Sequence, residues 1–281
     1  MSSTFWLTTL AMIAFAGNSI LARLALGEGA IDAAGYTGVR LASGAAVLAL
    51  LLVNANRKSV PAVRLPGGWP SALALFVYAV AFSYAYLQLG AAVGALVLFA
   101  SVQATMIAWG LIRGERPGLS EIAGLTIAFA AFVYWIAPAL VTPALLGTVL
   151  MIASGVAWGV YSLRGRAATD PMGETAGNFI RTVPLAIPLI ALSAFQSGMT
   201  TAGIVIAIAS GAVTSGLGYV LWYRALPGLT ATRASIVQLT VPVIAALGGV
   251  LFLAEALTLR FVLAATLILG GIALALLVRK R

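Results

Sequence analysis

The chain is a series of long apolar stretches separated by short polar connections. Ten stretches are long enough to cross a membrane, because a hydrocarbon core about 30 Å thick needs ~20 residues of α-helix. The pattern predicts an all-α integral membrane protein with ten transmembrane helices. The expected helices are 4–23, 33–53, 70–89, 92–112, 120–137, 143–163, 175–195, 202–223, 231–252 and 260–278.

The composition agrees with this pattern and narrows the class of protein. Of the 281 residues, 62% are hydrophobic and 8% are charged, and the mean hydropathy is +1.08. A soluble domain carries roughly 25% charged residues. The connections are too short to fold alone, which argues against an appended catalytic or nucleic-acid-binding domain. No basic segment precedes Phe5, so we interpret the first stretch as a membrane-spanning helix and not as a cleaved signal peptide.

The distribution of basic residues predicts the orientation. The net charge is +9, but these residues flank helices and form no basic arm, so no nucleic-acid partner is expected. With the N-terminus in the cytoplasm, the inner segments hold twelve basic residues and the outer connections two. Such a bias marks the cytoplasmic side, so both termini are expected there. The twelve are Arg57, Lys58, Arg64, Arg113, Arg116, Arg164, Arg166, Arg224, Arg233, Arg279, Lys280 and Arg281, and the two are Arg23 and Arg260.

Scarce charged residues recur at one spacing and indicate an internal duplication. Arg40 and Arg181 are 141 residues apart, and Glu115 and Glu255 are 140 apart. Because five helices are an odd number, a second five-helix repeat must enter the membrane from the opposite side. This inverted topology is common among secondary transporters, although an accidental register in a biased composition is the alternative. The expected halves are an N-terminal five-helix repeat at 1–137 and a C-terminal inverted repeat at 143–281.

Short motifs, most of them in the second half, resemble one transporter family. They are Ala157-Trp158-Gly159, Tyr223-Arg224-Ala225-Leu226, Pro242, Gly248-Gly249, Leu251-Phe252-Leu253-Ala254-Glu255 and Gly270-Gly271. On these residues the chain resembles the drug/metabolite transporter superfamily of the EamA type. The first half departs from the family, with Ala16-Gly17-Asn18 where Trp-Gly is usual and Val102 where the repeat would put a proline. The resemblance implies a multi-pass transporter of the bacterial inner membrane, and the chain looks like exporters of aromatic amino acids.

Polar and aromatic side chains deep in the predicted helices are candidates for substrate binding. Amides can bind a substrate carboxylate through NH₂ and an ammonium through C=O, and aromatic faces can hold an ammonium or an apolar group. The alternative is that these side chains join neighbouring helices. Trp158 differs from the other tryptophans, which fall near helix ends where aromatic belts form. The candidates are Gln103, Trp158, Tyr78, Asn18, Tyr161, Tyr219 and Gln238.

The remaining charged residues have more ordinary explanations. Arg40 and Arg181 lie within two turns of a helix end and are expected to extend to lipid headgroups. Glu115 and Glu255 follow helix ends and are expected to cap helices or contact loops. Pro242 removes a backbone hydrogen bond and is the expected hinge, so its helix should bend more than the helix around Val102.

The missing residue types constrain the mechanism. The chain has no cysteine and no histidine, and no acidic residue falls deep in a predicted helix, so no metal or other cofactor is expected. A proton-coupled carrier usually has a buried titratable group. We therefore expect uncoupled transport of small neutral or zwitterionic metabolites around a midplane cavity, with the membrane lipids and the substrate as partners and a monomer as one possible state. The first alternative is a sugar-nucleotide or lipid-precursor carrier of the same fold. A channel and an intramembrane enzyme are less favoured alternatives.

Overall fold

We describe a computed structural model of the chain, covering residues 3–56, 65–139, 144–196, 198–252 and 256–277. The helices in these ranges are α1 (Ser3–Ala22), α2 (Ala33–Asn56), α3 (Trp69–Ile112), α4 (Leu119–Ile136), α5 (Leu145–Gly165), α6 (Pro171–Phe195), α7 (Thr201–Ala209), α8 (Gly218–Ala225), α9 (Ala231–Val237), α10 (Thr240–Phe252) and α11 (Leu259–Leu277). The π-helical turns η1 (Arg23–Gly27) and η3 (Ser210–Leu217) extend α1 and join α7 to α8. The 3-10 turns η2 (Ala137–Ala139) and η4 (Leu226–Gly228) follow α4 and α8.

Over the described ranges, these helices form nine stretches that are long and apolar enough to cross a membrane. Three stretches combine several elements: Ser3–Gly27 joins α1 and η1, Thr201–Gly228 runs from α7 to η4, and Ala231–Phe252 joins α9 and α10. The predicted multi-pass helical membrane protein is therefore confirmed.

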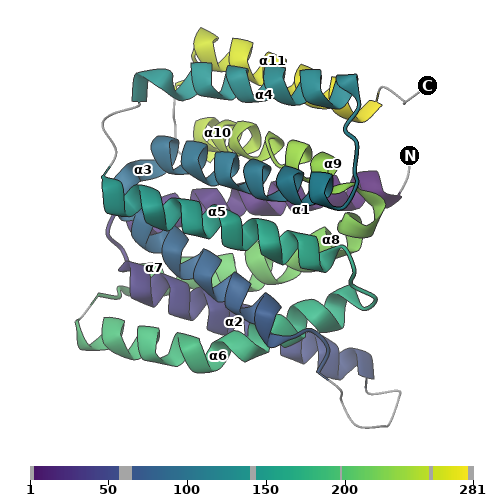
Figure 1. Cartoon of the computed structure of the whole chain (residues 1–281). Helices are drawn as coiled ribbons and strands as arrows, with labels where there is room; N and C mark the ends of the chain where they lie inside the picture. Colours follow the sequence, from purple (N-terminus) through teal and green to yellow (C-terminus); the bar gives the residue numbers. More distant parts are fainter. Residues whose placement is uncertain (1–2, 57–64, 140–143, 197, 253–255, 278–281) are drawn as a thin grey trace.

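Helix α3 contains two predicted helices, 70–89 and 92–112, in one element of 44 residues. At 1.5 Å per residue such a helix would be about 66 Å long, roughly twice the hydrocarbon thickness. It is not straight, because Gly90 has φ 68° and ψ 179°, which is not a helical conformation. Residues with a Cβ rarely adopt this φ, so glycine permits the turn. Figure 1 shows the two segments crossing the molecule in opposite directions.

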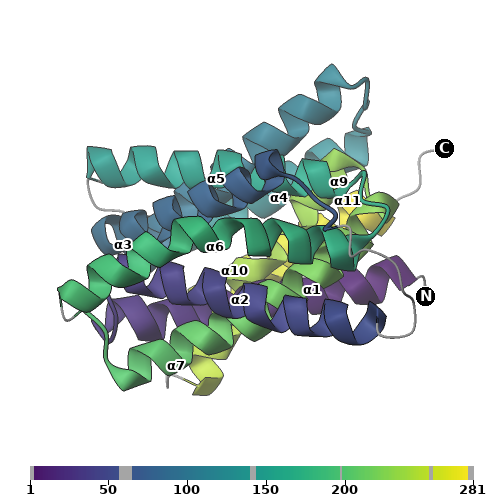
Figure 2. The same cartoon turned by 90° about the horizontal axis from the view of Figure 1, so that it is seen from below.

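The helices form a layered bundle with their axes roughly along one direction (Figure 1). Helices α4 and α11 pack as an outer pair at the top of this view, and α2 and α6 pack together at the bottom. Figure 2 shows α2, α6 and α7 on the lower face. Gly124 and Gly271 let the upper pair approach closely, since a Cβ on Gly124 would lie 2.3 Å from the carbonyl oxygen of Gly271.

The two ends of the bundle differ in the number of basic residues that they carry. Helix α1 begins and α11 ends at the same end, at the right of Figure 1, which we call the terminal end. Helices α3 and α5 also end there, so Arg113, Arg116, Arg164 and Arg166 lie there too. The opposite, far end holds η1 with Arg23 and the start of α11 with Arg260.

Candidate functional site

A cavity of about 300 Å³ lies toward the far end, between α1, α3, α4, α5 and α10. We call this cavity the vestibule. Its wall is mainly apolar and includes Phe82 of α3, Trp135 of α4 and Pro242 of α10. Arg23 is the one charged side chain among the described residues that line it. The vestibule can therefore admit a small solute with a substantial apolar part.

A smaller space of about 40 Å³ continues the vestibule toward the middle of the bundle, and we call it the deep pocket. The two spaces share Ser19, Phe82, Leu98, Phe99 and Val241. The other residues that line the deep pocket are Phe15, Asn18, Tyr78, Val102, Trp158, Tyr219 and Gln238. The fold thus brings five of the seven predicted binding residues to one space.

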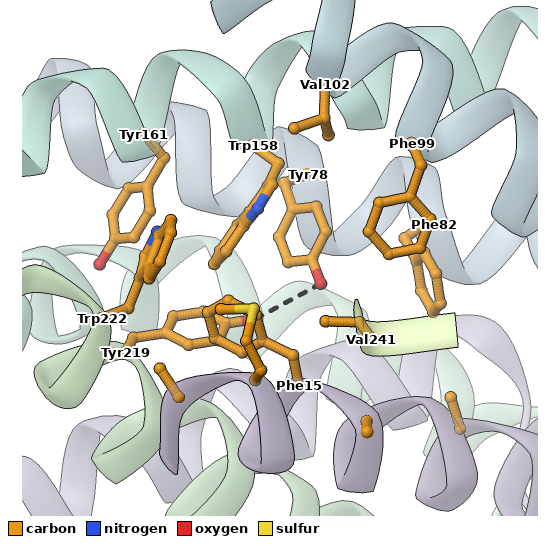
Figure 3. Close-up of a cluster of buried hydrophobic side chains, with 14 of the residues drawn as sticks. Phe15, Tyr78, Phe82, Phe99, Val102, Trp158, Tyr161, Tyr219, Trp222 and Val241 are labelled. Carbon is orange, nitrogen blue, oxygen red and sulfur yellow. Dashed lines mark hydrogen bonds between the residues drawn. The ribbon is translucent and has the colours of Figure 1, made fainter. Parts of the chain in front are cut away.

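Trp158 of α5 is the centre of the aromatic side chains around the deep pocket (Figure 3). Its ring centroid lies 4.8 Å from those of Tyr78 and Tyr219 and 5.2 Å from that of Phe15. Figure 3 shows Trp158 and Tyr78 facing Tyr219 and Phe15 across the site. Such edge-to-face and tilted contacts stabilise a rigid aromatic wall.

The aromatic packing continues from Trp158 toward the terminal end. Tyr161 stacks on Trp158 at 5.7 Å, and Tyr223 lies 4.8 Å from Tyr161. Trp222 donates a hydrogen bond to the Ser162 hydroxyl over 3.1 Å, and Tyr223 donates one to the Tyr161 carbonyl, also over 3.1 Å. We call Trp158, Tyr161, Tyr219, Trp222 and Tyr223 the aromatic barrier. All five are buried, and Trp158 and Tyr219 also line the deep pocket, so the barrier packs against the pocket on the side of the terminal end.

Small residues on α5 bring Trp158 close to α3. A Cβ on Gly155 would lie 2.5 Å from Cβ of Ser101, and one on Gly159 would lie 2.8 Å from Cγ2 of Thr105. Only glycine fits at such distances, so these two residues set the spacing of α3 and α5. Trp158, between them in the sequence, is thereby held against the deep pocket.

Gln238 holds Trp158 at a break between α9 and α10. The indole N–H of Trp158 donates to Oε1 of Gln238 over 2.7 Å, and Nε2 of Gln238 donates to the Ala234 carbonyl over 2.9 Å. The helix is interrupted at Gln238 and Leu239, one turn before Pro242. Proline cannot donate to the carbonyl four residues earlier, which here belongs to Gln238. The segment of α3 around Val102 has no such break.

Gln103 and Tyr161 lie beside the site but line neither space. Gln103 is buried, and its Nε2 donates to the Ser235 carbonyl over 2.9 Å, which joins α3 to α9. Its Oε1 has no hydrogen-bond partner among the described residues. Tyr161 is fully buried inside the aromatic barrier. The role of both in substrate binding stays a prediction.

Arg40 does not extend to headgroups, and that prediction is wrong. Its side chain is 1% exposed, between α2, η3 and α8. Nε donates to the Ser215 hydroxyl over 2.8 Å, and Nη2 donates to the Tyr219 hydroxyl over 2.7 Å. The guanidinium also lies 5.5 Å from the centroid of the Tyr78 ring. Rotation of α2 points Arg40 inward, and its distance from the helix end could not reveal that.

Arg181 instead binds backbone carbonyl groups close to the terminal end. Nη1 donates to the carbonyls of Pro66 and Gly177, each over 2.9 Å, and Nη2 donates to that of Leu65 over 3.0 Å. These contacts replace the predicted headgroup contact. They fasten the connection before α3 to α6.

Trp222 corrects the aromatic-belt interpretation, because it is fully buried in the barrier. Trp6 and Trp69, at 55% and 52% exposed, do lie on the surface near helix ends. Phe15, which lines the deep pocket, and Ser215, which accepts from Arg40, were missed by sequence reasoning. Phe15 lies one turn before Asn18 on α1, a spacing that could have identified it.

Acidic residues are absent from the described lining of the vestibule and the deep pocket. Over the described ranges, no three His, Cys, Asp or Glu side chains gather where they could hold a metal ion. Asp32 lies at the start of α2, where it accepts hydrogen bonds from the Gly35 backbone and the Ser193 hydroxyl.

Comparison with known proteins agrees with this architecture. The EamA-like transporter family matches residues 145–277. A Pseudomonas aeruginosa protein known only as an uncharacterized protein is 50% identical over 97% of this chain and 94% of its own length. The chain belongs to the EamA-like transporter family. An uncharacterized transporter of Archaeoglobus fulgidus is 29% identical over 75% of this chain and 78% of its own.

The fold of this EamA-like transporter has also been seen in a crystal. One crystal structure of a protein superimposes with a TM-score of 0.81 over 100% of this chain and 99% of its own, at 21% identity. At that identity the likeness shows the fold alone. The family and the relatives named transporters make the protein a membrane transporter, and its cavity lies among the helices.

Proposed function

We propose that this protein is a secondary transporter that exports small metabolites, amino acids with aromatic or apolar side groups among them, by alternating access. The observation that carries the proposal is the continuous path from the vestibule into the deep pocket, which ends at the aromatic barrier. A solute in this path would meet one open side and one closed side. The sequence resembles the bacterial aromatic amino-acid exporter YddG, which favours the same substrates.

The proposed topology has ten transmembrane segments in two inverted five-helix halves. The turn at Gly90 divides α3 into two segments of bilayer length, which supports ten crossings. The shared end of the first and last helices supports an even number. Because basic residues favour the cytoplasmic side, the terminal end is cytoplasmic and the vestibule faces outward in a bacterial inner membrane.

The size of the cavity favours a small substrate. Ligand pockets typically span about 300–1,000 Å³, so a vestibule of about 300 Å³ is at the lower limit. The rings of Phe15, Tyr78 and Trp158 could stack on an aromatic or apolar side group. Such a space suits a sugar nucleotide or a lipid precursor less well, because both are large and carry phosphates.

The closed side is held by ion pairs as well as by aromatic rings. Glu115 accepts hydrogen bonds from the backbone N–H groups of Ala231 and Thr232 over 2.9 and 3.3 Å, which caps the first turn of α9, and it pairs with Arg166 at 3.1 Å. Glu121 pairs with Arg233 at 2.7 Å. We call Glu115, Arg166, Glu121 and Arg233 the terminal latch. Opening toward the cytoplasm would require these pairs to separate.

The proposal is tested by flux in proteoliposomes made with the full chain. Labelled phenylalanine should enter faster than into protein-free vesicles, saturate with concentration, and exchange faster when the vesicles hold unlabelled phenylalanine. An imposed pH gradient should not drive accumulation, because no acidic residue among those described lines the cavity. Accumulation of several-fold would disprove uncoupled transport.

Other outcomes of the same assay would separate the alternatives. Flux that rises linearly and shows no exchange would favour a channel. Uptake of a labelled sugar nucleotide in place of phenylalanine would favour the larger-substrate carrier. Failure of every labelled amino acid to enter would overturn the proposed substrate class.

A further inference from the structure

Arg40 is a buried cation that has no acidic partner among the described residues. Its recorded hydrogen-bond partners are the hydroxyls of Ser215, Tyr219 and Tyr78, all of them neutral groups. No ion pair of Arg40 occurs within the described ranges, and its Nη1 has no hydrogen-bond partner there. A buried charge is costly unless it is paired, and in a membrane such residues usually mark a substrate or ion site.

The hydroxyls around Arg40 connect it to the deep pocket. Tyr219 accepts from Nη2 of Arg40 over 2.7 Å, and its own hydroxyl donates to that of Tyr78 over 3.4 Å. Both tyrosines line the deep pocket. Since the Tyr78 hydroxyl accepts from Tyr219 and Arg40, its own hydrogen remains available to a ligand.

Asn18 adds a second donor at the same wall. Its Oδ1 accepts from Ser210 over 2.6 Å and more weakly from Thr214 and Ser215 over 3.5 and 3.4 Å. No partner for its NH₂ group is recorded within the described ranges, and Asn18 lines the deep pocket. All three of these hydroxyls belong to the π-helical η3, a type of turn that is frequent at functional sites.

The opposite polarity is missing from the pocket. Gln238, the other amide there, already accepts from Trp158 through Oε1 and donates to Ala234 through Nε2. No carboxylate lines the deep pocket in the described part of the chain. The available polar groups are therefore donors beside one positive charge. They suit an anion, and they offer a substrate ammonium only the aromatic faces.

We propose that the deep pocket is a carboxylate site, with Arg40 as the counter-charge and Tyr78 and Asn18 as the donors. The transported species then needs an apolar or aromatic group and a carboxylate, and it does not need an amino group. Aromatic and branched organic monocarboxylates would bind at least as well as the corresponding amino acids. This inference rests on the proposed transport function and names the part of the substrate that is recognised.

Four related probes separate the two charged groups of an amino acid. Binding of phenylalanine, 3-phenylpropionate, phenylalanine amide and phenethylamine is measured on the full chain in detergent, by tryptophan fluorescence and by the shift in thermal unfolding. The first two carry a carboxylate and should bind, and the last two should bind at least about tenfold more weakly. Equal binding of acid and amide would overturn the inference and leave the carrier proposal standing, as would flux of phenylalanine that 3-phenylpropionate does not inhibit.

Variants test whether Arg40 provides the selectivity. Arg40→Gln should bring the affinity ratio of acid to amide close to one, and Arg40→Lys should keep most of it. Tyr78→Phe should weaken the acid several-fold and leave the amide unchanged. Arg181→Gln, which also removes an arginine from within a helix, is the matched control and should keep the full ratio. If Arg40→Gln does not fold, Tyr78→Phe and the four probes still decide, and an unchanged ratio in Tyr78→Phe counts against the site.

Discussion

The surroundings of Arg40 and Arg181 differ although both arginines lie early in an apolar helix. The guanidinium of Arg181 donates hydrogen bonds to three backbone carbonyl groups, so its charge lies among backbone dipoles near the terminal end. Arg40 donates to hydroxyl groups, its Nη1 has no hydrogen-bond partner among the described residues, and the tyrosines it contacts line a cavity. An arginine whose donors are hydrogen-bonded to the protein holds two segments together. An arginine beside a cavity that keeps a donor without a partner instead indicates a ligand.

The largest expected effect concerns the aromatic packing in front of Arg40. Trp158→Ala would remove a ring that packs against four others, and large-to-small changes of this kind cost about 3–5 kcal/mol. Thermal or denaturant unfolding in detergent measures the loss. Trp6→Ala is the control, because Trp6 is 55% exposed and should change stability little. Equal effects of both variants would contradict the packing around Trp158.

The two arginines should differ in stability when each is replaced by methionine. Arg181→Met removes charged donors from partly buried carbonyl groups and should lower the free energy of unfolding by about 1–3 kcal/mol. Arg40→Met removes a buried charge that has no acidic partner in the described part of the chain, so stability should change by less than about 1 kcal/mol or rise. Unfolding in detergent compares them directly. If Arg40→Met loses as much as Arg181→Met, Arg40 is also a structural fastener.

The terminal latch should weaken in acid. Burial alone would raise the pKa of Glu115, but the N–H groups of Ala231 and Thr232 and the Arg166 guanidinium outweigh it and lower that pKa. A carboxylate whose pKa is depressed stabilises the closed latch fully at pH values above the ordinary glutamate pKa of about 4.3. This stabilisation is lost as the pH falls through the depressed pKa. Spin labels can be attached after Leu119→Cys and Pro227→Cys. The distribution of distances between the two labels should broaden below about pH 4.3.

A matched variant isolates Glu115 in that experiment. Glu115→Gln should broaden the same distances already at neutral pH and remove their further change in acid. Unaltered distances in Glu115→Gln would show that the latch does not hold the terminal end closed. The absence of cysteine from the sequence makes the labelling specific.

The smallest expected effect concerns the break before Pro242. The Gln238 carbonyl accepts from the Val241 backbone N–H over 3.0 Å, and Pro242→Ala would offer it the N–H of an ordinary α-helical turn, which should straighten the junction of α9 and α10. The populations of the two access states should shift, and the transport rate should change by more than the affinity. Val102→Ala, in the unbroken segment of α3, is the control. Unchanged label distances across the vestibule in Pro242→Ala would exclude it as a hinge.

Much of the architecture followed from the sequence. The long apolar stretches predicted a multi-pass helical protein, because a helix of about 20 apolar residues matches the hydrocarbon thickness of a bilayer. Trp158 was singled out because it lies well inside a predicted helix, whereas the other tryptophans fall near predicted helix ends. The sequence also showed no acidic residue deep in a predicted helix, and this still limits the mechanisms that the cavity can use.

The rest needed the tertiary structure, because sequence shows depth along a helix but not the direction in which a side chain points. Arg40 and Trp222 were assigned to the lipid interface by depth, yet both face the protein interior. Gln103 and Gln238 had similar depths, and only Gln238 lines the pocket. The inward rotation of each helix is decided by contacts with its neighbours, such as Gly155 and Gly159 against α3. The carboxylate site is therefore a product of packing, and no pattern along the chain could have revealed it.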